Sequence, residues 1–148
     1  MVQKWLRASL FAAAGVLAVV LSFGATTSAE DKKTDKKGEK EPTIKEIMVK
    51  GHKGADAYLS KIGASAKGGK WEDAQEAAKG LAYFGETLVK LEPAKGDKKS
   101  WEPLAKQYAD ETKAVLKATE NKDAKATAAA LGAIGKSCMP CHKAHKGK

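Results

Sequence analysis

Five consecutive residues near the C-terminus, Cys138-Met139-Pro140-Cys141-His142, combine two thiols with an imidazole. The spacing C-x-x-C-H is that of the attachment motif for a c-type haem. In that chemistry the two thiols form thioethers with the haem vinyl groups, and the imidazole binds the iron. On a helix, Cys138, Cys141 and His142 share one face, because they lie three and four residues apart. The sequence therefore predicts one covalent haem c, with Cys138 and Cys141 as anchors and His142 as the proximal iron ligand.

Three other kinds of site use the same residue types. A thioredoxin-like C-x-x-C would need a βαβ setting, and the chain has no alternating strand pattern. A zinc site could use Cys138, Cys141, His142 and His145, but structural zinc sites usually join two ligand pairs across a longer loop. A disulfide between the two cysteines suits an exported protein but gives His142 no role. Haem attachment explains more of these features than any of the three.

The N-terminal segment is typical of an export signal. Lys4 and Arg7 precede the uncharged run 8–24, and small residues at 27–29 provide a cleavage site after Ala29. An uncleaved anchor is the alternative, because the run approaches the roughly 18 residues that span a bilayer. We expect residues 1–29 to be a signal peptide and the protein to be periplasmic or otherwise exported. Membrane contact is expected only if this segment is retained.

Charged residues dominate the next stretch, residues 30–42, which contains five Lys and five acidic residues and no aliphatic side chain. We expect this linker to be disordered, because it cannot bury apolar area to offset the entropy of ordering.

Loss of residues 1–29 lowers the net charge of the 148-residue chain from +9 to +7, because two basic residues and no acidic ones leave with it. A basic balance suits acidic partners. Nucleic acid is a poor candidate, because no Arg remains and the Lys do not concentrate beside aromatic residues.

From Thr43 onward, apolar residues recur at helical spacing, which predicts an all-α fold. Thr43 and Glu46 form a predicted capping box at the start of the first helix. The expected helices cover 44–62, 71–91, a segment capped by Ser100 with apolar positions from 101 to 116, and a last segment from about Ala124 past His142. Residues 63–70 and 121–123 are expected to be loops. Four such helices with short connections predict an antiparallel four-helix bundle over residues 43–148 that carries the haem near its C-terminus.

Five glycines lie inside these expected helices, although each costs about 1 kcal/mol relative to Ala. They are Gly51, Gly54, Gly80, Gly85 and Gly132. This pattern predicts that a bulky group approaches the helix backbones closely.

An exported four-helix bundle with C-x-x-C-H near its C-terminus resembles the class II c-type cytochromes, which comprise cytochrome c-prime and its low-spin, methionine-ligated relatives. The resemblance covers residues 43–148. It depends on residues 134–142 and on Ile47-Met48. Lys146 matches a basic residue that commonly follows the haem His by four positions. His145, where Phe is usual, and Pro140, which should kink the helix, depart from the family pattern.

The resemblance implies a second iron ligand on the far side of the haem. Low-spin members of the family take this ligand from a Met in the first helix, and Met48 stands at the matching place. His52 lies one turn beyond it on the same face and is the alternative distal ligand. Met48 could instead fill the core beside Ile44 and Ile47, as Met often does.

A six-coordinate His/Met haem implies an electron carrier that is not an enzyme and that exchanges single electrons with redox partner proteins. Lys residues near the haem edge would orient an acidic docking surface of the partner. The alternative is a five-coordinate, gas-binding haem protein of the cytochrome c-prime kind that binds NO or CO. A small peroxidase would need His52 as its base. The resemblance is also compatible with a homodimer that pairs through the first two helices.

Overall fold

The computed structural model describes residues 40–146, and this part of the chain is helical with no strand. The five helices are α1 (Ile44–His52), α2 (Tyr58–Lys67), α3 (Trp71–Lys90), α4 (Lys98–Glu120) and α5 (Ala124–His145). The all-α prediction is confirmed. No helix of residues 40–146 has the length and apolarity needed to cross a membrane. The predicted signal peptide and linker residues 30–39 lie outside the described residues.

The prediction of one continuous first helix is wrong, because two helices occupy residues 44–67. The predicted capping box is present in α1, where the Thr43 N–H donates to Glu46 Oε2 at 2.8 Å and the Glu46 N–H donates to Thr43 Oγ1 at 3.3 Å. α1 ends because Lys53 is extended and Gly54 has a φ of +90°, which only Gly adopts at little cost. The predicted loop 63–70 is also too long, because α2 continues to Lys67.

The later helices agree closely with the expectations, apart from one cap. α4 begins at Lys98 because Asp97, and not Ser100, is its N-cap, and Asp97 Oδ1 accepts from the Ser100 N–H at 2.8 Å. The N-cap of α5 is Asp123, whose Oδ1 accepts from the Ala126 N–H at 2.8 Å. A carboxylate at this position satisfies a backbone donor that the helix itself leaves free. α5 therefore begins where the sequence predicts and carries the whole C-x-x-C-H motif.

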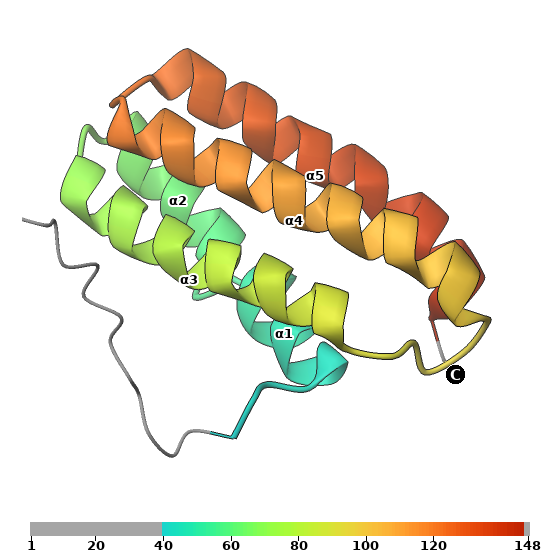
Figure 1. Ribbon diagram of the computed structural model, residues 1–148. Coiled ribbons are helices and arrows are strands. Elements are labelled where there is room, and N and C mark those ends of the chain that lie inside the picture. Colours follow the sequence, from blue (N-terminus) through green and yellow to red (C-terminus); the bar gives the residue numbers. More distant parts are fainter. Residues whose placement is uncertain (1–39, 147–148) are drawn as a thin grey trace, which may run out of the picture. The chain divides into compact units, whose positions relative to one another are not determined.

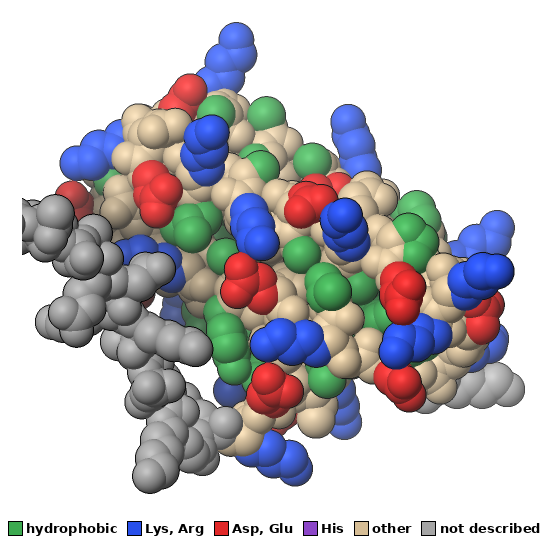
Figure 2. All heavy atoms as spheres, viewed as in Figure 1, with side chains coloured by type: hydrophobic (Ala, Val, Ile, Leu, Met, Phe, Trp, Pro, Cys, Tyr) green, Lys and Arg blue, Asp and Glu red, His purple; other side chains and the backbone are tan. Residues whose placement is uncertain are grey.

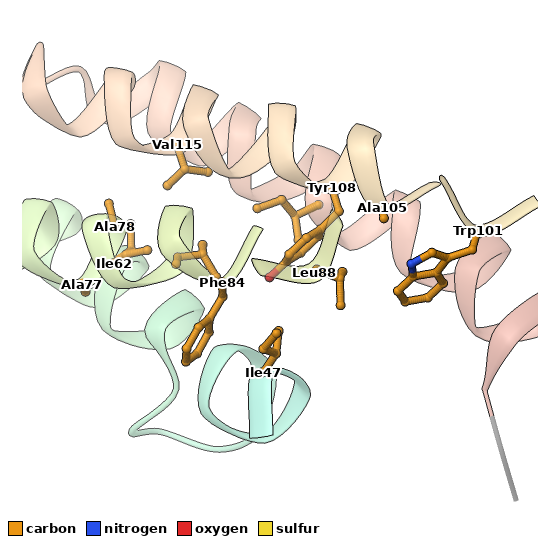
Figure 3. Close-up of a cluster of buried hydrophobic side chains, with 12 residues drawn as sticks. Ile47, Ile62, Ala77, Ala78, Phe84, Leu88, Trp101, Ala105, Tyr108 and Val115 are labelled. Carbon is orange, nitrogen blue, oxygen red and sulfur yellow. The ribbon is translucent and has the colours of Figure 1, made fainter. Parts of the chain in front are cut away.

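Helices α3, α4 and α5 run in alternating directions along one another (Figure 1). α2 packs against α3 and α5, and the short α1 packs against α2 and α3. Their apolar faces share one core (Figure 3). Its large members are Ile47, Ile62, Leu81, Phe84, Leu88, Trp101, Tyr108, Val115 and Ile134. Because α1, α4 and α5 all contribute to this core, side chains far apart in the sequence meet inside it.

Two of the helix glycines make room for the protein's own groups. A Cβ on Gly80 would lie 2.5 Å from the Tyr58 ring, and a Cβ on Gly85 would lie 3.0 Å from the Cα of Ala109 on α4. A Cβ on Gly132 would meet nothing within 4 Å, and Gly54 lies outside the helices. The close approach predicted from these glycines is therefore between helices at Gly80 and Gly85.

Candidate cofactor site

One cavity brings together the five residues that the sequence analysis named as haem anchors or iron ligands. Met48 and His52 of α1 line it from one side, and Cys138, Cys141 and His142 of α5 line it from the other. Its remaining lining residues are Leu88, Leu104, Tyr108 and Ser137. The cavity volume is about 80 Å³. Sulfur and imidazole groups from opposite ends of the described chain therefore face one space.

The α5 wall carries two free, half-buried thiols. The Cys138 thiol donates to the carbonyl oxygen of Ile134 at 3.1 Å. Burial raises the pKa of Cys138, and the Glu111 carboxylate adds to the rise. Burial also raises the pKa of Cys141, with a smaller contribution from Cys138. Cys138, Cys141 and His142 line one cavity, as expected for side chains on one face of α5. His142 is exposed and lies on the solvent side.

A hydrogen bond beside the motif ties α5 to α4. The Ser137 hydroxyl donates to Glu111 Oε2 at 2.6 Å, and Gln107 Nε2 donates to Glu111 Oε1 at 2.9 Å. Hydrogen bonds to a charged acceptor are among the stronger ones in proteins. Sequence reasoning missed Glu111, because no spacing rule connects it to Ser137. The pair fixes the start of the motif against the neighbouring helix.

The α1 wall offers two possible ligands, Met48 and His52, both half-buried. His52 Nε2 lies 2.9 Å from the Tyr108 hydroxyl oxygen, and the two rings are tilted with centroids 5.6 Å apart. Burial lowers the pKa of His52, and the nearby His142 lowers it further. Burial raises the pKa of Tyr108, so the phenol stays protonated. The sequence identified Tyr108 only as a core position, because its contact with His52 spans 56 residues.

His145 lies apart from the cavity lining, in a buried contact at the end of α5. Its Nδ1 is 2.9 Å from the carbonyl oxygen of Lys95, and its ring meets the Trp101 ring edge-on at 5.3 Å. It is therefore engaged elsewhere than in the four-residue zinc set considered above. Across residues 40–146, no three His, Cys, Asp or Glu side chains are grouped so as to hold a metal ion.

A larger hollow of about 470 Å³ lies between α2 and α3, but it contains none of the predicted site residues. Its lining residues are Tyr58, Lys61, Ser65, Asp73, Glu76 and Ala77. Its three charged lining residues, Lys61, Asp73 and Glu76, are exposed to solvent. The smaller cavity is the better candidate because its residue types match a specific chemistry.

The donor set of the smaller cavity fits a haem attached to α5. Two adjacent thiols can form its covalent links, an imidazole lies beside them, and a thioether and a second imidazole face them from α1. Imidazole and thioether are both ligands that proteins use for haem iron. No protein-family model, curated protein or solved structure matches this chain.

Proposed function

We propose that this protein is an exported monohaem c-type cytochrome that carries single electrons between redox partners. The observation that carries the proposal is the cavity in which Met48 and His52 of α1 face the C-x-x-C-H motif of α5. We further propose that α2, α3, α4 and α5 form an antiparallel four-helix bundle, with α1 as an extension of its first helix. The packing of α2 against both α3 and α5 supports this arrangement, because it closes the set of four.

Six of the nine residues that line the cavity have a task in this proposal. Cys138 and Cys141 would hold the haem covalently on α5, and His142 and Met48 would serve as its iron ligands. When bound, the haem supplies an iron that gains or loses one electron. Leu88 and Leu104, which line the same space, exclude water from it. Ligation by the same two residues in both oxidation states would leave little in the protein to rearrange during electron transfer.

A macrocycle needs more room than the present cavity of about 80 Å³, so one wall must move when haem binds. We infer that α1 is the moving wall. It has nine residues, and it connects to α2 through the extended Lys53 and the left-handed Gly54. Small changes in backbone angles at these two residues would move Met48 more than His52, because His52 adjoins them, so the contact between His52 and Tyr108 can be kept.

We place the partner-docking surface at the exposed side of α5. Lys136, Met139 and Lys143 follow one another there at helical spacing, next to the rim residue His142, and all four are exposed. On the face drawn in Figure 2, by contrast, Lys and acidic side chains alternate, so that face has no patch of a single charge. An acidic partner would be drawn to the α5 side, and its association rate should fall as salt rises. A rate independent of ionic strength would contradict this placement.

Absorption spectra of the purified oxidised and reduced holoprotein test the proposal. Ligation by Met48 gives low-spin bands and a long-wavelength Met–iron charge-transfer band in the oxidised form. Met48→Ala should abolish that band and give a high-spin spectrum. Met139→Ala is the matched control, because this Met is 70% exposed and should leave the band unchanged.

The opposite results would favour the five-coordinate, gas-binding alternative. A high-spin wild-type spectrum, with ready carbon monoxide binding by the reduced form, would rule out the electron-carrier assignment. Covalent attachment has a separate test: the double variant Cys138→Ala, Cys141→Ala should lose its haem on denaturing electrophoresis, where the wild type retains it. Retention in the double variant would contradict the assigned anchors.

A further inference from the structure

The α1 wall presents two competing groups, one turn apart, to the same cavity. Met48 and His52 both line it. A neutral imidazole can serve as an iron ligand through a free ring nitrogen, so His52 competes with Met48 if one of its nitrogens is free. Position on the helix alone does not decide between the thioether and the imidazole.

The Tyr108 hydroxyl distinguishes the two groups. Its oxygen is 2.9 Å from His52 Nε2, the ring nitrogen that lies farther from the backbone and reaches deepest into a site. In one tautomer the phenol donates to the Nε2 lone pair, and in the other the Nε2–H donates to the phenol oxygen. In both cases Nε2 cannot bind iron. Nδ1 is closer to the backbone than Nε2 along the side chain, so it reaches less far into the cavity.

Tyr108 itself is held firmly in place. Its side chain is 7% exposed, and its ring extends from α4 toward α1 (Figure 3). A Cβ on Gly51 would lie 3.8 Å from the hydroxyl oxygen, so the backbone of α1 passes close by. The hydroxyl is thus buried where water has little access, and giving up its bond to His52 would leave it without a partner. A buried polar group left unpaired costs about 1–3 kcal/mol.

We propose that Tyr108 selects the distal iron ligand: its hydroxyl holds His52 away from the haem and leaves the position to Met48. This inference rests on the proposed function, because it concerns a ligand of the same haem. Tyr108 is a positioning residue in this account, since it acts through His52 and does not bind the iron. Removing its hydroxyl should free His52 to replace Met48.

Spectroscopy of holoprotein variants tests the selection directly. Tyr108→Phe should lose the Met–iron charge-transfer band, remain low-spin with two imidazole ligands, and show a lower reduction potential. Tyr108→Phe combined with His52→Ala should regain the band, because the competitor is gone. Tyr83→Phe is the matched control, because it removes a hydroxyl from a half-exposed ring and should leave the spectrum unchanged. A Tyr108→Phe spectrum that retains the band would overturn the proposal.

A second variant, Met48→Ala, tests the same proposal if Tyr108→Phe fails to fold. In Met48→Ala, with Tyr108 intact, His52 should remain held and the iron should be high-spin. A low-spin, two-imidazole spectrum of Met48→Ala would overturn the selection by Tyr108 while leaving the electron-carrier assignment standing. A wild-type protein that lacks the Met–iron band would instead refute the proposed function itself.

Discussion

The two walls of the cavity are built in different ways. α5 has 22 residues, begins at the Asp123 cap, and is tied to α4 through Ser137 and Glu111. At its far end His145 contacts Lys95 in the segment between α3 and α4. α1 has nine residues, packs on α2 and α3, and is followed by the break at Gly54. The wall with the attachment motif is thus fixed at several points along a long helix.

The wall with the second ligand depends on few contacts. Ile47 is its fully buried anchor, and His52 is its polar contact with α4. An isolated helix of nine residues is marginal in water, so α1 is helical because it packs on its neighbours. In the proposed cytochrome, α5 would therefore keep the haem in place and α1 would adjust the coordination of its iron. Variants that affect one wall and not the other can test this difference.

The largest expected effect comes from two matched truncations, Ile134→Ala on α5 and Ile47→Ala on α1, since both residues are 0% exposed. Ile134→Ala should lower the free energy of unfolding by about 4 kcal/mol, and Ile47→Ala by about 2 kcal/mol, because the short helix can settle into the gap. Urea unfolding measures both costs. Only Ile47→Ala should weaken the Met–iron band. Equal costs, or an unchanged band in Ile47→Ala, would contradict the comparison.

Two glycine substitutions should change the free energy of unfolding in opposite directions. Gly85→Ala places a Cβ against Thr112 Oγ1 and 3.0 Å from the Cα of Ala109, so it should lower the free energy of unfolding by about 1–3 kcal/mol. A Cβ on Gly51 meets its nearest side-chain atoms at 3.7 Å, an ordinary contact distance. Gly51→Ala should therefore raise the free energy of unfolding by about 0.5–1 kcal/mol. Thermal unfolding of the two variants measures both changes in stability. A lower stability of Gly51→Ala would show that α1 cannot accommodate a Cβ at this position.

His145→Phe tests the fixed end of α5. The wild-type imidazole is 4% exposed, and its Nε2 has no hydrogen-bond partner among residues 40–146. Phe removes this buried unpaired nitrogen, at the cost of the hydrogen bond to Lys95. Removing the unpaired nitrogen should gain more than losing the hydrogen bond costs, so the free energy of unfolding should rise by about 1 kcal/mol. Chemical unfolding should therefore show a small gain in stability, and His145→Ala, which leaves a gap beside Trp101, should show a clear loss.

The smallest expected effect is a change in the stability of the protein at low pH. Hydrogen bonds from Thr43 lower the pKa of Glu46 below its ordinary value of 4.5. The carboxylate therefore stabilises α1 above that pH, and this contribution is lost as the pH falls through the lowered value. Glu46→Gln should make the stability of the protein slightly less sensitive to acid below pH 4.5. Unfolding curves at pH 7 and pH 3 for the variant and the wild type measure the difference, and parallel curves would show that the cap has no effect.

The sequence predicted α5 well because its signals are local. Asp123 precedes the apolar positions of the helix, and the spacing within C-x-x-C-H defines one face. The break between α1 and α2 was missed because the helical spacing continues through it, at Ala55, Tyr58 and Leu59. Only the conformation of Gly54 reveals the break, and a glycine inside an apolar pattern does not by itself show its φ angle.

The residues of the candidate site also differ in whether a local sequence signal identifies them. Cys138, Cys141 and His142 were predicted from the motif. Met48 was predicted from the resemblance to class II c-type cytochromes, and His52 as the alternative one turn away on the same helix face. Tyr108 and Glu111 were missed because their partners lie 56 and 26 residues away. A periodic pattern shows which side a residue faces, but not which side chain meets it across the core. The unpredicted contacts are therefore the ones between helices.

The half-buried state of the two thiols has a consequence for their reactivity. Burial raises the pKa of both Cys138 and Cys141, so few thiolates exist at neutral pH. The thiolate is the form that reacts with oxidants and disulfides. The folded wall of α5 thus slows the oxidation of its own cysteines.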